Sequence, residues 1–307
     1  MAEATVALSG VAKRYGALTA VSGVDLSLGQ GECIALVGHN GAGKSTLIKL
    51  MLGLIRPSEG AVRVLGEDPA ASRAVRGKAG IGFLPENVAV PPAMTGLELL
   101  VFYARLKGER TDGLGDLLGR VGLAEAGRRR VGTYSKGMRQ RLGLAQALLG
   151  EPRVLLLDEP TTGLDPELRR QFYEIVRTLR DGGATVLLSS HALTELEERA
   201  DRVVVMNRGV MVACGTMAEL RGLVDLPVRI LLRVPDNGPA AVPEALAGVG
   251  DLRRVNGHIV EITCRHHDKM AVLRRVVGLP VAVEDIEIML PTLDELYANF
   301  MQRKAPR

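Results

Sequence analysis

The stretch that most constrains this 307-residue chain is residues 38–46, Gly-His-Asn-Gly-Ala-Gly-Lys-Ser-Thr. An apolar strand pattern at 34–37 precedes it, and an apolar helix pattern at 47–52 follows it. In this context the glycines let successive backbone N–H groups point at one anion, and the helix adds the positive end of its dipole. We predict that this phosphate loop binds a nucleoside triphosphate; a glycine-rich turn that binds nothing is the disfavoured alternative.

Separate roles are expected for the residues of the loop. Lys44 is long enough to reach the β- and γ-phosphates, and the hydroxyl of Ser45 is placed to bind Mg2+. The other loop residues that we predict to bind nucleotide are Gly38, Asn40, Gly41, Gly43 and Thr46.

A second apolar strand pattern, at 154–157, ends in the adjacent carboxylates Asp158 and Glu159. Neighbouring side chains on a strand point to opposite faces, so the two acids can act separately. We expect Asp158 to hold Mg2+ and Glu159 to orient or deprotonate an attacking water. Alone, such a pair could mark only the point where a strand reaches solvent; the phosphate loop upstream makes that reading improbable.

A third motif, Tyr-Ser-Lys-Gly-Met-Arg-Gln-Arg at 134–141, opens a helical pattern. Ser135 as N-cap, with Gly137 allowing close backbone approach, gives a helix start suited to a phosphate. The motif resembles the signature of the ATP-binding-cassette family, usually Leu-Ser-Gly-Gly-Gln. With the loop and the acidic strand, it makes residues 1 to about 220 similar to one cassette of that family.

The resemblance implies further site residues. Tyr15 stands where the family stacks an aromatic ring on adenine, Asp165 stands in the D-loop, and His191 stands where the γ-phosphate is contacted. Glu86 replaces the usual Gln, and we expect it to help bind Mg2+ through water. Lys136 replaces a usual Gly of the signature. The implied ligands are ATP and Mg2+, and the implied catalytic residues are Glu159, His191 and Lys44.

The predicted fold class is α/β, a P-loop cassette with a RecA-like core, antiparallel β pieces and a helical subdomain. We predict the cassette over residues 1–222, with the helical subdomain at about 88–150. Predicted core elements are strands at 33–37, 81–84, 154–157, 185–188 and 203–206, and helices at 167–180 and 192–199.

From about residue 223 the pattern becomes strand, helix, two strands, helix, strand, followed by a last helix. We expect these elements at 227–234, 240–247, 252–255, 259–263, 267–277 and 281–288, with a capping box of Thr292 and Glu295 opening the last helix. This order predicts a small ferredoxin-like accessory domain over 223–307.

Charge and composition restrict the partners. The formal net charge is only +4, with both signs interspersed, and aromatic residues total 3%, so we expect no nucleic-acid partner. No apolar run reaches the ~18 residues of a membrane span, and we read no secretory signal at the start. The resemblance implies a homodimer that drives an integral membrane permease. The expected location is therefore cytoplasmic, peripheral on the inner face of the membrane.

Shorter strings, among them Leu-Pro-Glu-Asn-Val at 84–88 and Leu-Pro-Val-Arg-Ile at 226–230, resemble one branch of the family more narrowly. This is the NosF branch, whose ATPases serve copper-site maturation of nitrous oxide reductase. It implies a NosY-like permease and, through it, a NosD-like periplasmic protein, with copper or sulfur as cargo. The alternatives are the ATPase of a drug or lipid exporter, and a soluble cassette ATPase acting on ribosomes or DNA.

Overall fold

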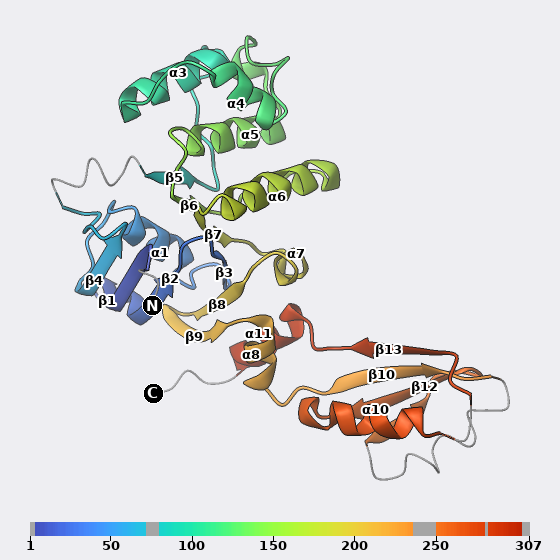
Figure 1. Ribbon diagram of the computed structural model, residues 1–307. Helices are drawn as coiled ribbons and strands as arrows, with labels where there is room; N and C mark the ends of the chain where they lie inside the picture. Colours follow the sequence, from blue (N-terminus) through green and yellow to red (C-terminus); the bar gives the residue numbers. More distant parts are fainter. Residues whose placement is uncertain (1–3, 72–79, 236–249, 280–281, 303–307) are drawn as a thin grey trace. The chain divides into compact units, whose positions relative to one another are not determined.

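The computed structural model describes residues 4–71, 80–235, 250–279 and 282–302 (Figure 1). They form two compact units, one reaching to Cys214 and the other starting at Gly215. Our predicted boundary, between residues 222 and 223, lies at the end of helix α8 (Met217–Gly222).

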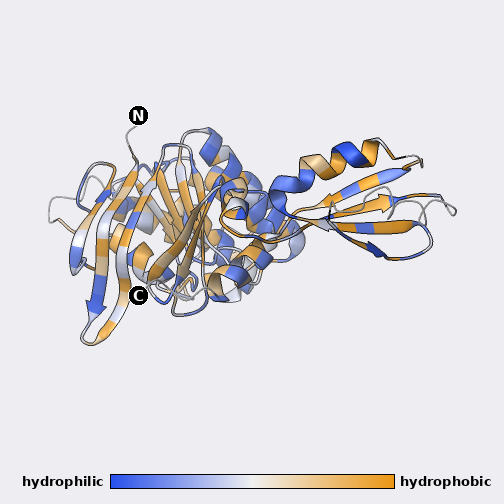
Figure 2. Ribbon diagram, turned by 90° about the horizontal axis from the view of Figure 1, so that it is seen from below, coloured by the Kyte–Doolittle hydropathy of each residue, from blue (hydrophilic) through white to orange (hydrophobic). Residues whose placement is uncertain are grey.

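The first unit is built on a six-stranded sheet. Its strand order is β5 (Ile81–Leu84), β6 (Val154–Leu157), β7 (Thr185–Ser189), β3 (Cys33–Val37), β8 (Arg202–Asn207) and β9 (Val210–Gly215). The pairs from β5 through β8 are parallel. Every residue of β3, β6 and β7 is buried, which explains their unbroken apolar sequences. Figure 2 shows these apolar strands between helices with hydrophilic outer faces.

A three-stranded antiparallel sheet shares this core. It has the order β2 (Leu18–Leu28), β1 (Val6–Tyr15) and β4 (Glu59–Val64), and its apolar residues pack in one cluster with those of β3 and of helix α1 (Lys44–Met51). Register shifts interrupt the β1–β2 pairing between Leu8 and Arg14. Such irregularities break the period-2 pattern from which strands are recognised in a sequence.

Three helices form the predicted helical subdomain: α3 (Gly96–Lys107), α4 (Leu114–Arg120) and α5 (Lys136–Ala147) lie together in Figure 1. A capping box of Thr95 and Glu98 opens α3. Next to α5, the Tyr134 hydroxyl donates to the Ala126 carbonyl at 2.6 Å. The helices predicted at 167–180 and 192–199 are α6 (Pro166–Asp181) and the shorter α7 (Leu193–Glu197).

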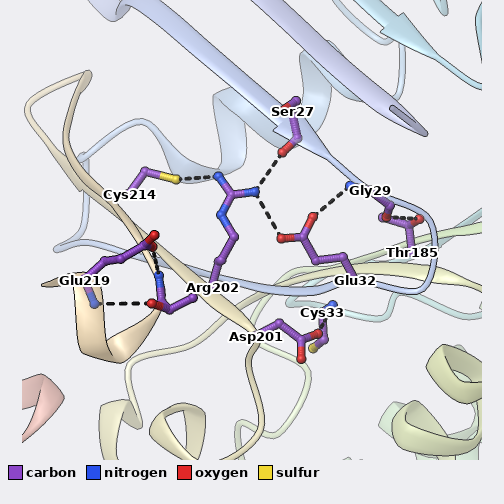
Figure 3. A network of polar contacts seen from close by, with 10 residues as sticks. Ser27, Gly29, Glu32, Cys33, Thr185, Asp201, Arg202, Cys214 and Glu219 are labelled. Atoms are coloured by element: carbon purple, nitrogen blue, oxygen red, sulfur yellow. Dashed lines mark hydrogen bonds and ion pairs between the residues drawn. The ribbon is translucent and has the colours of Figure 1, made fainter. Parts of the chain in front are cut away.

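A polar network joins the start of β3 and β8 to their neighbours (Figure 3). The guanidinium of Arg202 donates to Glu32 Oε1 at 3.0 Å, to the Ser27 carbonyl at 3.1 Å and to Cys214 Sγ at 3.0 Å. Beside it, burial raises the pKa of the Cys33 thiol to about 12. Cys33 and Cys214 are both free thiols, the first buried and the second half-buried.

The second unit has a four-stranded antiparallel sheet. Its order is β11 (Asp251–Arg254), β12 (Ile259–Cys264), β10 (Val228–Arg233) and β13 (Asp285–Met289), which is the strand order of the ferredoxin-like fold. The predicted helix at 240–247 lies outside the described residues. Helix α10 (Lys269–Val277) contributes Val272 and Val276 to the core. Thr292 and Glu295 cap α11 (Leu293–Gln302) as predicted.

Among the residues described, no helix combines the length and apolar character needed to cross a membrane.

Candidate nucleotide-binding site

The phosphate loop connects β3 to α1 and lines a pocket of about 610 Å³. The backbone is packed so closely here that only glycine fits at two positions. A Cβ on Gly43, whose φ is +104°, would lie 2.6 Å from the Ala20 carbonyl oxygen, and one on Gly38 would lie 2.7 Å from that of Met206. The glycine spacing in the sequence thus reflects contacts with β2 and β8.

Lys44 is the first residue of α1 and is only 7% exposed. Its ammonium donates a hydrogen bond to the Gly38 carbonyl, across the base of the loop. Burial lowers the pKa of Lys44, while the carboxylates of Glu159, Asp158 and Glu86 pull it upward. Lys44 is therefore a desolvated cation among three acids, held where an anion in the loop would meet it.

Asp158 joins the loop to the sheet. Ser45 Oγ donates to its Oδ2 at 3.0 Å, and Ser189 Oγ, at the end of β7, donates to its Oδ1 at 2.7 Å. Ser189 Oγ in turn accepts from the Glu159 backbone N–H at 2.9 Å. Three separate segments are thus held together by one buried carboxylate and two hydroxyls.

Glu159 adopts a left-handed backbone conformation, with φ of +49°, which is uncommon for a non-glycine residue. Its Oε2 accepts from the His191 backbone N–H at 3.2 Å, and its Oε1 lies 3.1 Å from His191 Nε2. Apart from this contact with the ring, buried Oε1 has no hydrogen-bond partner among the described residues. Burial raises the pKa of Glu159, against the opposing charges of His191 and Lys44.

Tyr15 lies at the end of β1, lines the same pocket and is 47% exposed. The Lys13 ammonium sits 5.1 Å from the centre of its ring, so one face of the ring already meets a cation. An exposed aromatic side chain beside the phosphate loop can stack on a flat ring.

The signature residues lie elsewhere. Ser135 caps α5 by accepting from the Met138 N–H at 3.2 Å, and Asp165 caps α6 by accepting from the Leu168 N–H at 2.9 Å. The aliphatic chain and ammonium of Lys136 pack against Gly163 of the D-loop in the same chain. None of these residues lines the described phosphate-loop pocket. One chain therefore brings together the loop, the acidic pair and His191, but not the signature.

Three residues of this region were missed from the sequence. Ser189 bridges Asp158 and Glu159, and buried Gln140 of α5 donates to the Pro160 carbonyl at 3.1 Å, just after the acidic pair. Arg208 lines the pocket from the turn between β8 and β9. The only available signal was position: Ser189 directly follows the strand that we predicted at 185–188.

Comparisons with known proteins bear on this site. Residues 21–162 match the family model described as ABC transporter. The daunorubicin resistance ATP-binding protein DrrA3 of Streptomyces coeruleorubidus is 37% identical over 97% of this chain and 96% of its own length. The chain belongs to the ABC transporter ATP-binding proteins. It is accordingly an ATP-binding, ATP-hydrolysing cassette.

Two further similarities support this assignment. The Nod factor export ATP-binding protein I of Burkholderia orbicola (strain AU 1054) is 33% identical over 91% of this chain and 92% of its own length. A solved structure of the ATP binding subunit of an ABC transporter superposes with a TM-score of 0.67 at 29% identity, covering 71% of this chain and 92% of that one. The cassette fold predicted from the sequence is confirmed.

Proposed function

We propose that the pocket of the phosphate loop is the ATP site, and that this cassette drives an export permease as one half of a dimer. The observation that carries the proposal is the gathering of Lys44, Ser45, Asp158, Glu159 and His191 at the carboxyl ends of parallel strands. Ligands of parallel α/β sheets bind at this edge.

The residues present fit Mg2+. Ser45 Oγ and Asp158 Oδ2 lie 3.0 Å apart, and hydroxyl and carboxylate oxygens are the hard ligands that this ion takes beside phosphate oxygens. When bound, the ion would neutralise charge on the β- and γ-phosphates. Exposed Glu86 acts electrostatically on Lys44, which supports a place for it near the same phosphates, with water between.

The roles that we propose for the chain's own groups follow from their surroundings. Lys44 binds the β- and γ-phosphates. Glu159 Oε1, which lacks a hydrogen-bond donor, accepts a proton from the attacking water, and a raised pKa makes this carboxylate a better base near neutral pH. His191 holds the other carboxylate oxygen through its N–H and presents a half-exposed imidazole towards the γ-phosphate side.

The dimer is proposed because the site in one chain is incomplete. Ser135 and Gly137 stand at an open helix start on α5, outside the phosphate-loop pocket. A second copy packed head to tail would place its α5 N-terminus, with the helix dipole behind it, against the γ-phosphate held by the first copy. Binding of ATP then joins the copies, and hydrolysis separates them.

Export is proposed from the relatives. One is named for daunorubicin resistance and another for Nod factor export, and each matches more than nine tenths of this chain, second unit included. The proposed partner is an integral membrane permease on whose cytoplasmic side the dimer sits, and the proposed cargo class is an amphipathic small molecule.

The NosF resemblance stays as a second candidate, favoured only by the strings at 84–88 and 226–230. The relatives named above do not point to copper. In the described residues, no three His, Cys, Asp or Glu side chains gather in a way that could hold a metal ion. The second candidate therefore requires that copper or sulfur pass through the NosY-like and NosD-like partners and not through this chain.

Affinity purification from detergent-solubilised membranes, with partners identified by mass spectrometry, tests the proposal. We expect one polytopic permease, and ATP hydrolysis by the purified assembly that rises with added daunorubicin and not with copper salts. Recovery of a periplasmic protein beside the permease would favour the copper-maturation candidate. Recovery of ribosomal or DNA-bound proteins without a permease would contradict transport altogether.

A further inference from the structure

Arg208 is an exposed cation in the wall of the nucleotide pocket that the family's motifs do not account for. It follows the last residue of β8 and lines the pocket together with Tyr15 and the phosphate loop. Its guanidinium has no hydrogen bond or ion pair with any residue in the described part of the chain. An arginine without an acidic partner, facing a pocket built for a polyanion, is available to that anion.

The turn that carries Arg208 is fixed to the phosphate loop on both sides of this residue. His39 of the loop contacts the Asn40 carbonyl through Nδ1 at 2.7 Å and Asn207 Oδ1 through Nε2 at 3.1 Å. The Gly209 N–H donates to the Ala42 carbonyl at 2.9 Å. Arg208 is therefore placed against the part of the loop that precedes Lys44.

The backbone of Arg208 is strained. Its φ is +48°, which lies in the left-handed region. Residues with a Cβ avoid this region, whereas glycine adopts it readily. Next to it, Gly209 also has positive φ, and a Cβ there would lie 2.8 Å from the Ala20 carbonyl oxygen. Glycine would relieve this backbone strain, so an Arg208→Gly variant separates the role of the side chain from that of the backbone.

We infer that Arg208 is a nucleotide-contacting residue, whose guanidinium binds the phosphate oxygens that ADP and ATP have in common. Backbone N–H groups of such a loop cradle the α- and β-phosphates, whereas the lysine reaches the β- and γ-phosphates. We assign Arg208 to the α- and β-phosphates because its turn is bonded to residues 39–42 of this loop and not to Lys44. This inference rests on the proposed location of the ATP site.

The test is equilibrium binding of ADP and of ATP to the full-length protein by titration calorimetry. For Arg208→Ala we expect both dissociation constants to rise by about tenfold, the usual effect of losing one charge-assisted hydrogen bond. Arg208→Lys should retain part of the affinity. Arg208→Gly should lose affinity like the alanine variant and yet unfold at a higher temperature, because glycine relieves the positive φ.

Glu151→Gly is the matched control. Glu151 is exposed, has φ of +50° and is absent from the lining of the nucleotide pocket, so its replacement should raise the unfolding temperature and leave nucleotide binding unchanged. Unchanged dissociation constants in Arg208→Ala, beside a wild-type protein that binds both nucleotides, would overturn the inference and leave the site in place. Loss of ATP binding alone would overturn the shared-phosphate assignment. A wild-type protein that binds neither nucleotide would overturn the site and the inference together.

Discussion

The phosphate loop and the signature helix belong to the same unit of the fold, but they differ in how completely they are assembled. Around the loop, Lys44, Asp158 and Glu159 are all buried, and Ser45 and Ser189 form hydrogen bonds with the acidic pair. At the start of α5, Ser135 is exposed and, among the described residues, bonds only to its own helix. This difference supports our proposal that one chain fixes the groups that act on phosphate, whereas the start of α5 meets the phosphate held by a second copy.

Lys44→Ala tests the buried groups around the phosphate loop and should have the largest effect. Loss of the desolvated ammonium removes the cation that meets the transferred phosphate, so ATP hydrolysis should fall by about a thousandfold. Steady-state phosphate release measures this effect. Lys49→Ala, on the exposed side of α1, is the control and should hydrolyse ATP at the wild-type rate.

Ser135→Ala tests the exposed start of helix α5. If this hydroxyl meets the phosphate of another copy, hydrolysis should fall by about tenfold or more while ATP binding to a single chain is unchanged. Thr95→Ala is the matched control, because Thr95 caps α3 in the same way. Both variants should lose roughly 1 kcal/mol of stability from the lost cap, but only Ser135→Ala should lose ATP hydrolysis. Equal losses of turnover in Ser135→Ala and Thr95→Ala would mean that Ser135 acts only as a helix cap.

Glu159→Gln tests the burial of the acidic pair through its effect on the stability of the fold. Because burial raises the pKa of this carboxylate in the folded state, its charged form is unfavourable there, and stability from this group is lost as pH rises through the raised pKa. Replacement by glutamine should therefore raise the unfolding temperature by a few degrees at pH 7 to 8. The gain should vanish below the ordinary glutamate pKa. Thermal unfolding of both proteins across pH 4 to 8 measures it, and a lower unfolding temperature at neutral pH would contradict the desolvated site.

Glu86→Gln should have the smallest effect. The Glu86 carboxylate is exposed and pulls the pKa of Lys44 upward, so it is a screened negative charge near the phosphates. Its removal should tighten ATP binding by about two- to fivefold. Titrations at low and high salt measure the change, and a difference that persists unreduced at high salt would assign Glu86 a direct contact instead.

The sequence predicts those parts of this molecule that depend on short patterns. Strands β3 and β6 begin and end where the apolar runs predict, and the capping box of Thr292 and Glu295 forms as expected. Their causes are local: burial on both faces of a strand, and hydrogen bonds three residues apart. The ferredoxin-like strand order of the second unit also follows from the order of such elements.

What the sequence did not indicate depends on contacts between distant segments. The bridge from Ser189 to Asp158 spans 31 positions, and the contact of His39 with Asn207 spans 168. The positive φ of Glu159 could not be predicted from its residue type, because glutamate ordinarily avoids this conformation. These features arise only when parallel strands align their carboxyl ends, so they required the folded structure.

We propose that the nucleotide site is completed by a second copy of the chain. Light scattering of the Glu159→Gln protein after size exclusion, with and without ATP and Mg2+, tests it most directly, because this variant should bind ATP and fail to hydrolyse it. We predict a change from 32.8 kDa to twice that mass on addition of ATP, abolished by Ser135→Arg in the same protein. A protein that binds ATP and keeps the mass of one chain would contradict completion of the site by a second copy.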